Sequence, residues 1–133
     1  MNDSGPVEPI ASRFITRAEQ VRADRTLKPD AFIPPESLEL SVTMLNGDPA
    51  RIWIRGLAVI AERVRTLPSC RLIGRGDIRV NSLRECRPLT IRPDPTPDDP
   101  HHAIIVDWPP EKAGRKVLAI QLSQQASFIP CAA

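Results

Sequence analysis

Residues 101–116 read HHAIIVDWPPEKAGRK, and this stretch decides much of the fold. Its first part, residues 102–108, is rich in Ile and Val, which favours an interior β-strand. Two prolines follow: the first keeps the preceding residue out of helical geometry, and the second has the φ angle of a first helical turn. The stretch therefore predicts a strand followed directly by a helix, which runs from Pro110 to about residue 126.

A second helix is predicted upstream of this junction. Asp48 is a good N-cap, Pro49 suits the first helical position, and Pro68 ends the run. Helical spacing of apolar residues predicts a buried stripe made of Trp53, Leu57, Ile60, Ala61 and Val64. The opposite side carries Arg51, Arg55, Glu62 and Arg65. We therefore expect a helix that packs on the core and presents arginines to solvent.

The segments before this helix predict short strands and loops. Alternating apolar and polar residues at 38–44 indicate a half-buried strand, and a shorter strand is expected at 12–16. The two prolines within residues 31–35 favour an edge segment, because proline cannot donate to a central ladder. The charge-dense residues 17–30 predict a solvated loop or short helix.

Together these elements predict one α+β domain with a mostly antiparallel sheet of about four to five short strands and two main helices on one face. The polar residues 1–11 are expected to form a flexible N-terminal segment, so that the domain spans residues 12–133. With 133 residues, 41% hydrophobic and 26% charged, the length and composition agree with a single globular domain.

The cysteines and the hydropathy pattern indicate a cellular compartment. The chain has neither a signal-peptide pattern nor the run of about 18 apolar residues that a membrane span needs. Cys70, Cys86 and Cys131 form no CxxC or His–Cys pairing, which argues against a disulfide framework and a zinc site. These features predict a reduced cytoplasmic protein with no membrane contact, and neither a metal nor a cofactor is expected.

The net charge of +2 hides a strongly basic middle segment. Residues 1–50 sum to −3, residues 51–92 to +7 and residues 93–133 to −2, and every cation of the middle segment is an arginine, whose planar fork suits phosphate and carboxylate groups. The predicted binding surface consists of Arg51, Arg55, Arg65, Arg75 and Arg79. Three roles stay open for it: contact with an acidic protein, contact with a nucleic-acid backbone, or pairing with the acidic ends of the same chain.

The last predicted helix carries two apolar stripes on nearly opposite sides. One stripe consists of Ala113, Val117 and Ile120, and the other of Leu118, Leu122 and Ala126. A helix with two apolar faces is either enclosed within the fold or lends one face to another subunit. We expect the second arrangement, with Leu118 and Leu122 contacting another protein subunit or a second copy of the chain.

His101 and His102 are the only histidines in the chain, and they stand at the entry of the predicted strand. Adjacent residues of a strand face opposite ways, so the pair is not expected to chelate one metal. In a nuclease or phosphoesterase, one of them would act as general base, with Lys116 nearby and arginines holding phosphate. Because no acid pair or nucleophile–base set accompanies the histidines, we favour a structural role.

The motif Gly74-Arg-Gly-Asp77 lies within residues 70–80, which predict a short strand or turn leading into a short helix over 80–86. Its Arg-Gly-Asp triplet matches a cell-adhesion motif by chance, since nothing else indicates secretion. The glycine spacing fits neither the P-loop nor the dinucleotide-binding fingerprint. A tight turn or a close backbone approach explains the two glycines more simply.

Three segments of the chain resemble a group of small uncharacterised bacterial proteins. They are AFIPP running into LELSV at 31–42, GRGDI at 74–78 and HAIIVDWPPEK at 102–112. The group more often has Gly-Arg-Ala-Asp in the second block and His-Ala-Asn-Ile in the third, so Gly76 and Ile104 depart from it. The resemblance implies an accessory or defence-type gene neighbourhood, and it brings no catalytic residue.

These features favour a non-catalytic binding or accessory subunit of a bacterial, defence-type protein complex. It would use the arginine-rich surface and the two-faced last helix. The alternatives are a nucleic-acid-binding module without chemistry and a His-dependent nuclease or phosphoesterase.

Overall fold

In the computed structural model, the described residues are 9–45, 49–66 and 71–131. Along the chain, the elements are β1 (Ile10–Ile15), the 3-10 turns η1 (Ala18–Gln20) and η2 (Pro29–Phe32), β2 (Leu40–Leu45), α1 (Pro49–Thr66), β3 (Gly74–Arg79), α2 (Val80–Arg84), β4 (Thr90–Pro93), β5 (His102–Val106), α3 (Lys112–Gln125) and β6 (Ser127–Pro130). None of the helices among these residues is long and apolar enough to cross a membrane.

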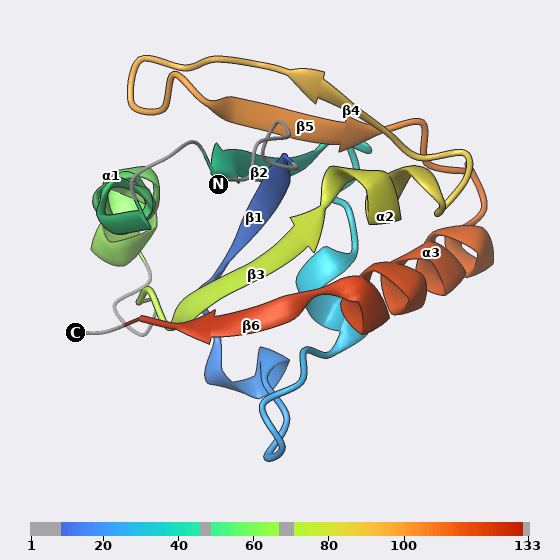
Figure 1. Cartoon of the computed structure of the whole chain (residues 1–133), viewed down its shortest axis with the longest axis horizontal. Helices are drawn as coiled ribbons and strands as arrows, with labels where there is room; N and C mark the ends of the chain where they lie inside the picture. Colours follow the sequence, from blue (N-terminus) through green and yellow to red (C-terminus); the bar gives the residue numbers. More distant parts are fainter. Residues whose placement is uncertain (1–8, 46–48, 67–70, 132–133) are drawn as a thin grey trace, which may run out of the picture.

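The strands form one antiparallel sheet in the order β4-β5-β2-β1-β3-β6. The central strands β1 and β2 pair with Ser12 opposite Thr43. α1 connects β2 to β3, and α3 connects β5 to β6, so each long helix carries the chain across the middle of the sheet. Figure 1 shows the sheet between these two helices.

The predicted α+β class and antiparallel sheet are confirmed, although the sheet has six strands where four to five were expected. The expectation of two helices on one face is wrong. Leu122 of α3 packs in one core cluster with Ala11 of β1. Gly56 of α1 instead approaches Phe14 of β1, to which an added Cβ would be only 2.8 Å. Ala11 and Phe14 are three residues apart on one strand, so they face opposite sides of the sheet.

The main hydrophobic core lies between the sheet and α3. Its largest fully buried side chains are Phe32, Ile15, Leu27, Leu40, Ile78, Leu83, Ile105 and Leu122. Gly76 allows the segment around η2 to approach β3, because a Cβ at this position would lie 2.6 Å from Leu27 Cδ1 and 3.2 Å from Phe32 Cζ. The glycines of the Gly74–Arg79 segment therefore provide the close approach that the sequence predicted, but within a strand rather than a tight turn.

α1 follows the predicted bounds closely, but its buried stripe differs from the prediction. Ile52 and Ile60 are 1% and 4% exposed, and Gly56 between them is buried, so the packed face repeats every four residues. Leu57 and Val64, expected in the core, are 57% and 41% exposed. The helix has two apolar stripes, and the sequence interpretation assigned the outer one to the core.

α3 shows the same inversion. Leu118 and Leu122, expected to contact another subunit, are 6% and 0% exposed and belong to the core of the chain itself. The opposite stripe is the one that reaches solvent, with Val117 and Ile120 exposed. The prediction that Leu118 and Leu122 contact another subunit is therefore wrong, because both side chains pack in the core of the chain.

Several boundaries also differ from the prediction. β1 begins at Ile10, and Ala11 is buried, so the ordered domain starts before the expected boundary at residue 12. The expected edge segment at 31–35 overlaps the 3-10 turn η2, and β6 was not predicted at all. The predicted N-cap Asp48, the stop at Pro68 and most of the predicted N-terminal segment lie outside the described residues.

Candidate functional site

Arg75, predicted to line a binding surface, instead joins α1 to the sheet. It lies on β3 with 6% of its surface exposed, and its Nε donates to Asp77 Oδ1 at 3.0 Å. Its guanidinium also lies over the Trp53 ring of α1, 4.7 Å from the ring centroid, as a cation–π contact. Both contacts hold Arg75 inside the molecule. Its role is therefore structural, which corrects the prediction that it lines a binding surface. The same geometry turns Asp77 inward, where it also accepts a hydrogen bond from the Ser12 hydroxyl.

Arg55 also points toward the body of the protein. Its Nε lies 4.0 Å from Oδ1 of Asp99, whose surface is 0% exposed. Asp99 accepts further hydrogen bonds from the hydroxyl of Thr43 on β2 and from the backbone N–H of His101. A buried carboxylate is stable only with such partners. Arg55 is therefore part of a polar cluster that fastens α1 to β2 and to the segment before β5.

The other predicted arginines lie on the surface. Arg51 and Arg65 are exposed on α1, and Arg79 is exposed at the end of β3. The single five-arginine surface that the sequence predicted is therefore reduced to three exposed members, two of which share one helix.

The outer face of α1 carries a row of exposed apolar side chains. Ile54 is 68% exposed, Leu57 57% and Val64 41%, and the exposed Ala50 and Ala61 lie in the same row. The intervals alternate between four and three residues, which is the repeat of a coiled-coil seam. We call these five residues the α1 stripe.

A cationic margin runs along one side of the α1 stripe. Arg51, Ala58 and Arg65 recur every seven residues and therefore line one flank of a heptad seam. On the other flank lie Trp53 and Ile60, which are half-buried and buried against the sheet. The face is thus apolar along its centre, positive on one side and continuous with the protein body on the other.

Sequence reasoning missed Ile54, the most exposed large apolar residue of the α1 stripe. The four-three spacing was present in the sequence and could have indicated a second seam. It was overlooked because Leu57, Ala61 and Val64 also fit a single buried stripe with Trp53 and Ile60. Helical spacing shows that residues share a face, but it does not show which face meets the sheet.

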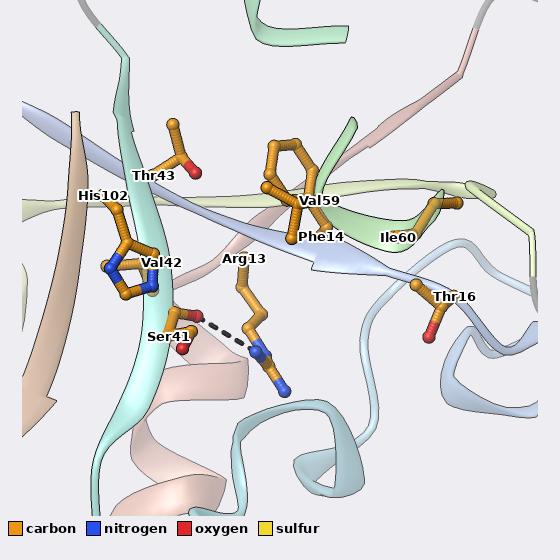
Figure 2. A pocket seen from close by; sticks show the side chains of 9 residues that line it. All are labelled: Arg13, Phe14, Thr16, Ser41, Val42, Thr43, Val59, Ile60 and His102. Carbon is orange, nitrogen blue, oxygen red and sulfur yellow. Dashed lines mark hydrogen bonds between the residues drawn. The ribbon is translucent and has the colours of Figure 1, made fainter. Parts of the chain in front are cut away.

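A cavity of about 150 Å³ lies between α1 and the sheet, and Figure 2 shows the side chains that line it. Phe14, Val59 and Ile60 form its apolar part, close to α1. Arg13 points away from them and donates to the backbone oxygens of Ser41 and Ala31, each at 3.0 Å. The polar groups of this cavity therefore do not converge on one point, as a catalytic site requires.

The residues considered for catalysis are not brought together. His102 lines the cavity, but its Nδ1 lies 2.8 Å from the backbone oxygen of Asp94 and 3.2 Å from Oδ2 of the same residue. Lys116 lies on α3, which packs on the opposite face of the sheet. His101 contributes its backbone N–H to Asp99, as described above. These contacts favour the structural role that the sequence indicated for both histidines.

Two thiols in the described part of the chain are free. Neither belongs to the polar cluster around Asp99 or to the lining of the cavity. Cys86 is buried beyond α2, and Cys131 is half-buried after β6. Burial raises the pKa of the Cys86 thiol, and the neighbouring Glu85 carboxylate raises it further. Over the same described residues, no group of three His, Cys, Asp or Glu side chains is placed to hold a metal ion.

Comparisons of the chain with protein-family models, with curated proteins and with solved structures found no match.

Proposed function

We propose that this protein is a non-catalytic accessory subunit that binds a partner protein through the outer face of α1. The observation that carries the proposal is the exposure of Ile54, Leu57 and Val64 at coiled-coil spacing. Large apolar side chains scattered singly on a surface need no explanation, but a continuous row along one helix marks an interaction face. Burying Ile54 and Leu57 contributes about 1.5–3 kcal/mol each.

The geometry favours a protein partner over a nucleic acid. A nucleic-acid surface presents converging cations to the phosphate backbone. Here Arg75 and Arg55 turn inward to Asp77 and Asp99, and the centre of the exposed face is apolar. The arginine-rich segment thus serves partly to hold α1 on the sheet, and its exposed members flank an apolar face.

The partner best matched to this face is an amphipathic helix with an apolar seam and an acidic flank. The α1 stripe spans residues 50–64, which is about 21 Å of helix and long enough for a four-turn helical contact. The exposed Arg51 and Arg65 along its margin favour carboxylates on the partner.

A second copy of the chain fits this face less well. The exposed charges along the margin of the α1 stripe, Arg51 and Arg65, are both positive, so pairing the stripe with itself would bring like charges together. We therefore propose a heterotypic complex. The cytoplasmic, bacterial and defence-type setting belongs to the same proposal and rests on the sequence resemblance and the free thiols.

Synthetic peptides test this proposal. The probe is a 21-residue amphipathic helix, about the length of six turns, with Leu at its seam positions and Glu along both flanks; its twin carries Lys in place of every Glu. Fluorescence anisotropy should show that the acidic peptide binds at least about tenfold more tightly than the basic twin, with affinity falling as salt screens the arginine contacts. Leu57→Glu should abolish binding.

The matched control is Val117→Glu, which places the same charge at an exposed apolar position of α3 on the other side of the sheet. It should leave peptide binding unchanged. Equal binding of the two peptides, or equal loss in Val117→Glu and Leu57→Glu, would contradict the proposal. Circular dichroism of both variants establishes that the helices are intact.

A further inference from the structure

A second hollow lies on the α3 side of the sheet, away from the α1 stripe. It has a volume of about 320 Å³ and opens between the segment that follows η2 and the first turns of α3. Ile33, Pro34, Pro35 and Leu38 form its apolar wall, and three cations from α3 stand opposite. We call it the α3 hollow.

The apolar wall of the α3 hollow is rigid. Its two prolines have fixed φ angles, and the turn after them is closed by the Leu38 N–H, which donates to the Pro35 oxygen at 2.9 Å. Leu38 has a φ of +57°, which a leucine rarely adopts and which sets the direction of its side chain at the hollow. Ile33 remains 43% exposed beside it. This wall is therefore formed before any ligand arrives.

The opposite wall is cationic. Lys112, Arg115 and Lys116 are three and four residues apart, so they share one face of α3. The Arg115 guanidinium is held in place, because its Nη1 donates to the backbone oxygens of Pro109 and Pro110 at 3.3 and 2.5 Å. The ammonium groups of Lys112 and Lys116 make no hydrogen bond or ion pair with any residue that the structure describes.

The position of these cations conflicts with the helix dipole. The N-terminus of a helix carries partial positive charge and is stabilised by acidic residues. Lys112 is the first residue of α3, and the only acidic residue at this helix end is the N-cap Glu111, directly before it. Glu36 is the one carboxylate in the lining of the hollow. The lining therefore holds three cations and one carboxylate, and this excess of positive charge favours an anionic ligand.

We propose that the α3 hollow binds a small aliphatic carboxylate. The hydrocarbon chain lies against Ile33, Pro34 and Leu38, and the carboxylate accepts hydrogen bonds from Lys112 and Lys116. The volume of the hollow is near the lower end of the range for ligand pockets, about 300–1,000 Å³, which favours a short- or medium-chain ligand. This proposal does not depend on the function proposed for α1.

Other classes of ligand would interact with only part of the α3 hollow. An inorganic anion would leave the apolar wall without a contact. A peptide in extended conformation gains affinity from main-chain hydrogen bonds, but Pro34 and Pro35 have no backbone N–H to offer. An aliphatic carboxylate needs only the apolar contact and the cations, both of which the hollow provides.

Calorimetric titration with hexanoate, octanoate and decanoate at pH 8 tests the proposal. Affinity should rise about fourfold for each added methylene until the wall is covered. Decanol, which has a decanoate-like chain without the charge, should bind at least about tenfold more weakly than decanoate. The double variant Lys112→Gln/Lys116→Gln should lose about tenfold or more of its decanoate affinity while keeping the wild-type affinity for decanol.

Two controls make the result specific. Lys28→Gln removes the remaining lysine of the chain, which lies outside the hollow, and should not change decanoate binding. Leu57→Glu should not change it either, which separates this proposal from the one for α1. Equal affinity for decanoate and decanol, insensitivity to the double variant, or ligand-induced NMR shifts at the cavity beneath α1 instead of at Ile33 and Leu38 would overturn the proposal.

Discussion

At the scale of single residues, the polar groups beneath α1 explain why the arginine count was misleading. Arg75 and Arg55 add to the positive charge of the middle segment, but their guanidinium groups pair with Asp77 and Asp99 inside the molecule. Asp99 is fully buried, so its position depends on its partners. The linear charge distribution showed that cations cluster between residues 51 and 92, but it could not show which of them face inward.

The Cys86 thiol gives a residue-scale prediction. Its pKa lies above the ordinary value of 9.0, mainly because of burial, and the thiolate is the reactive form. At pH 8, iodoacetamide should therefore modify Cys86 far more slowly than the half-buried Cys131. Mass spectrometry of the digested protein measures both rates. Similar rates in the folded protein would contradict the placement of Cys86.

The same shift sets the sign of a pH effect on stability. A thiol whose pKa is raised by folding stabilises the folded state while it is protonated. That contribution is fully present below the pKa of the unfolded chain, near 9.0, and is lost as the pH rises through the folded value. Replacing Cys86 by Ala should therefore weaken the fall in stability above pH 9.

At the scale of elements, the sequence predicted both long helices, both apolar stripes of α3 and a single apolar stripe of α1. It assigned the stripes to the wrong sides, because a hydrophobic period identifies a face without its partner. On α1 the packed face is Ile52–Gly56–Ile60, where glycine permits contact with Phe14. β6 was missed because it is four residues long and ends in Pro130, which gives almost no alternation to detect.

The two stripes of α3 differ in a measurable way. Leu122 is fully buried, so Leu122→Ala should lower the free energy of unfolding by about 2–5 kcal/mol. Val117 is 54% exposed, and Val117→Ala should change it by no more than about 0.5 kcal/mol. Urea denaturation of the two variants tests this difference. A larger loss of unfolding free energy in Val117→Ala than in Leu122→Ala would contradict the orientation of α3 on the sheet.

At the scale of the whole molecule, the α+β class, the antiparallel sheet and the strand-to-helix junction after β5 could be predicted from local patterns. The placement of the helices on opposite faces could not, because it depends on strand order and on the register that turns Ser12 and Ala11 to different sides. The exposed α1 stripe and the α3 hollow both follow from that arrangement. Each is assembled from segments that the sequence pattern does not relate to one another.

The central claim is that α1 binds a partner protein, and native mass spectrometry of the tagged protein purified from its source cells tests it most directly. The account predicts a defined complex with a second kind of chain for the wild type and for Val117→Glu, and the free monomer for Leu57→Glu. A complex that survives Leu57→Glu unchanged, or a wild-type protein that is purified only as a monomer, would contradict the claim.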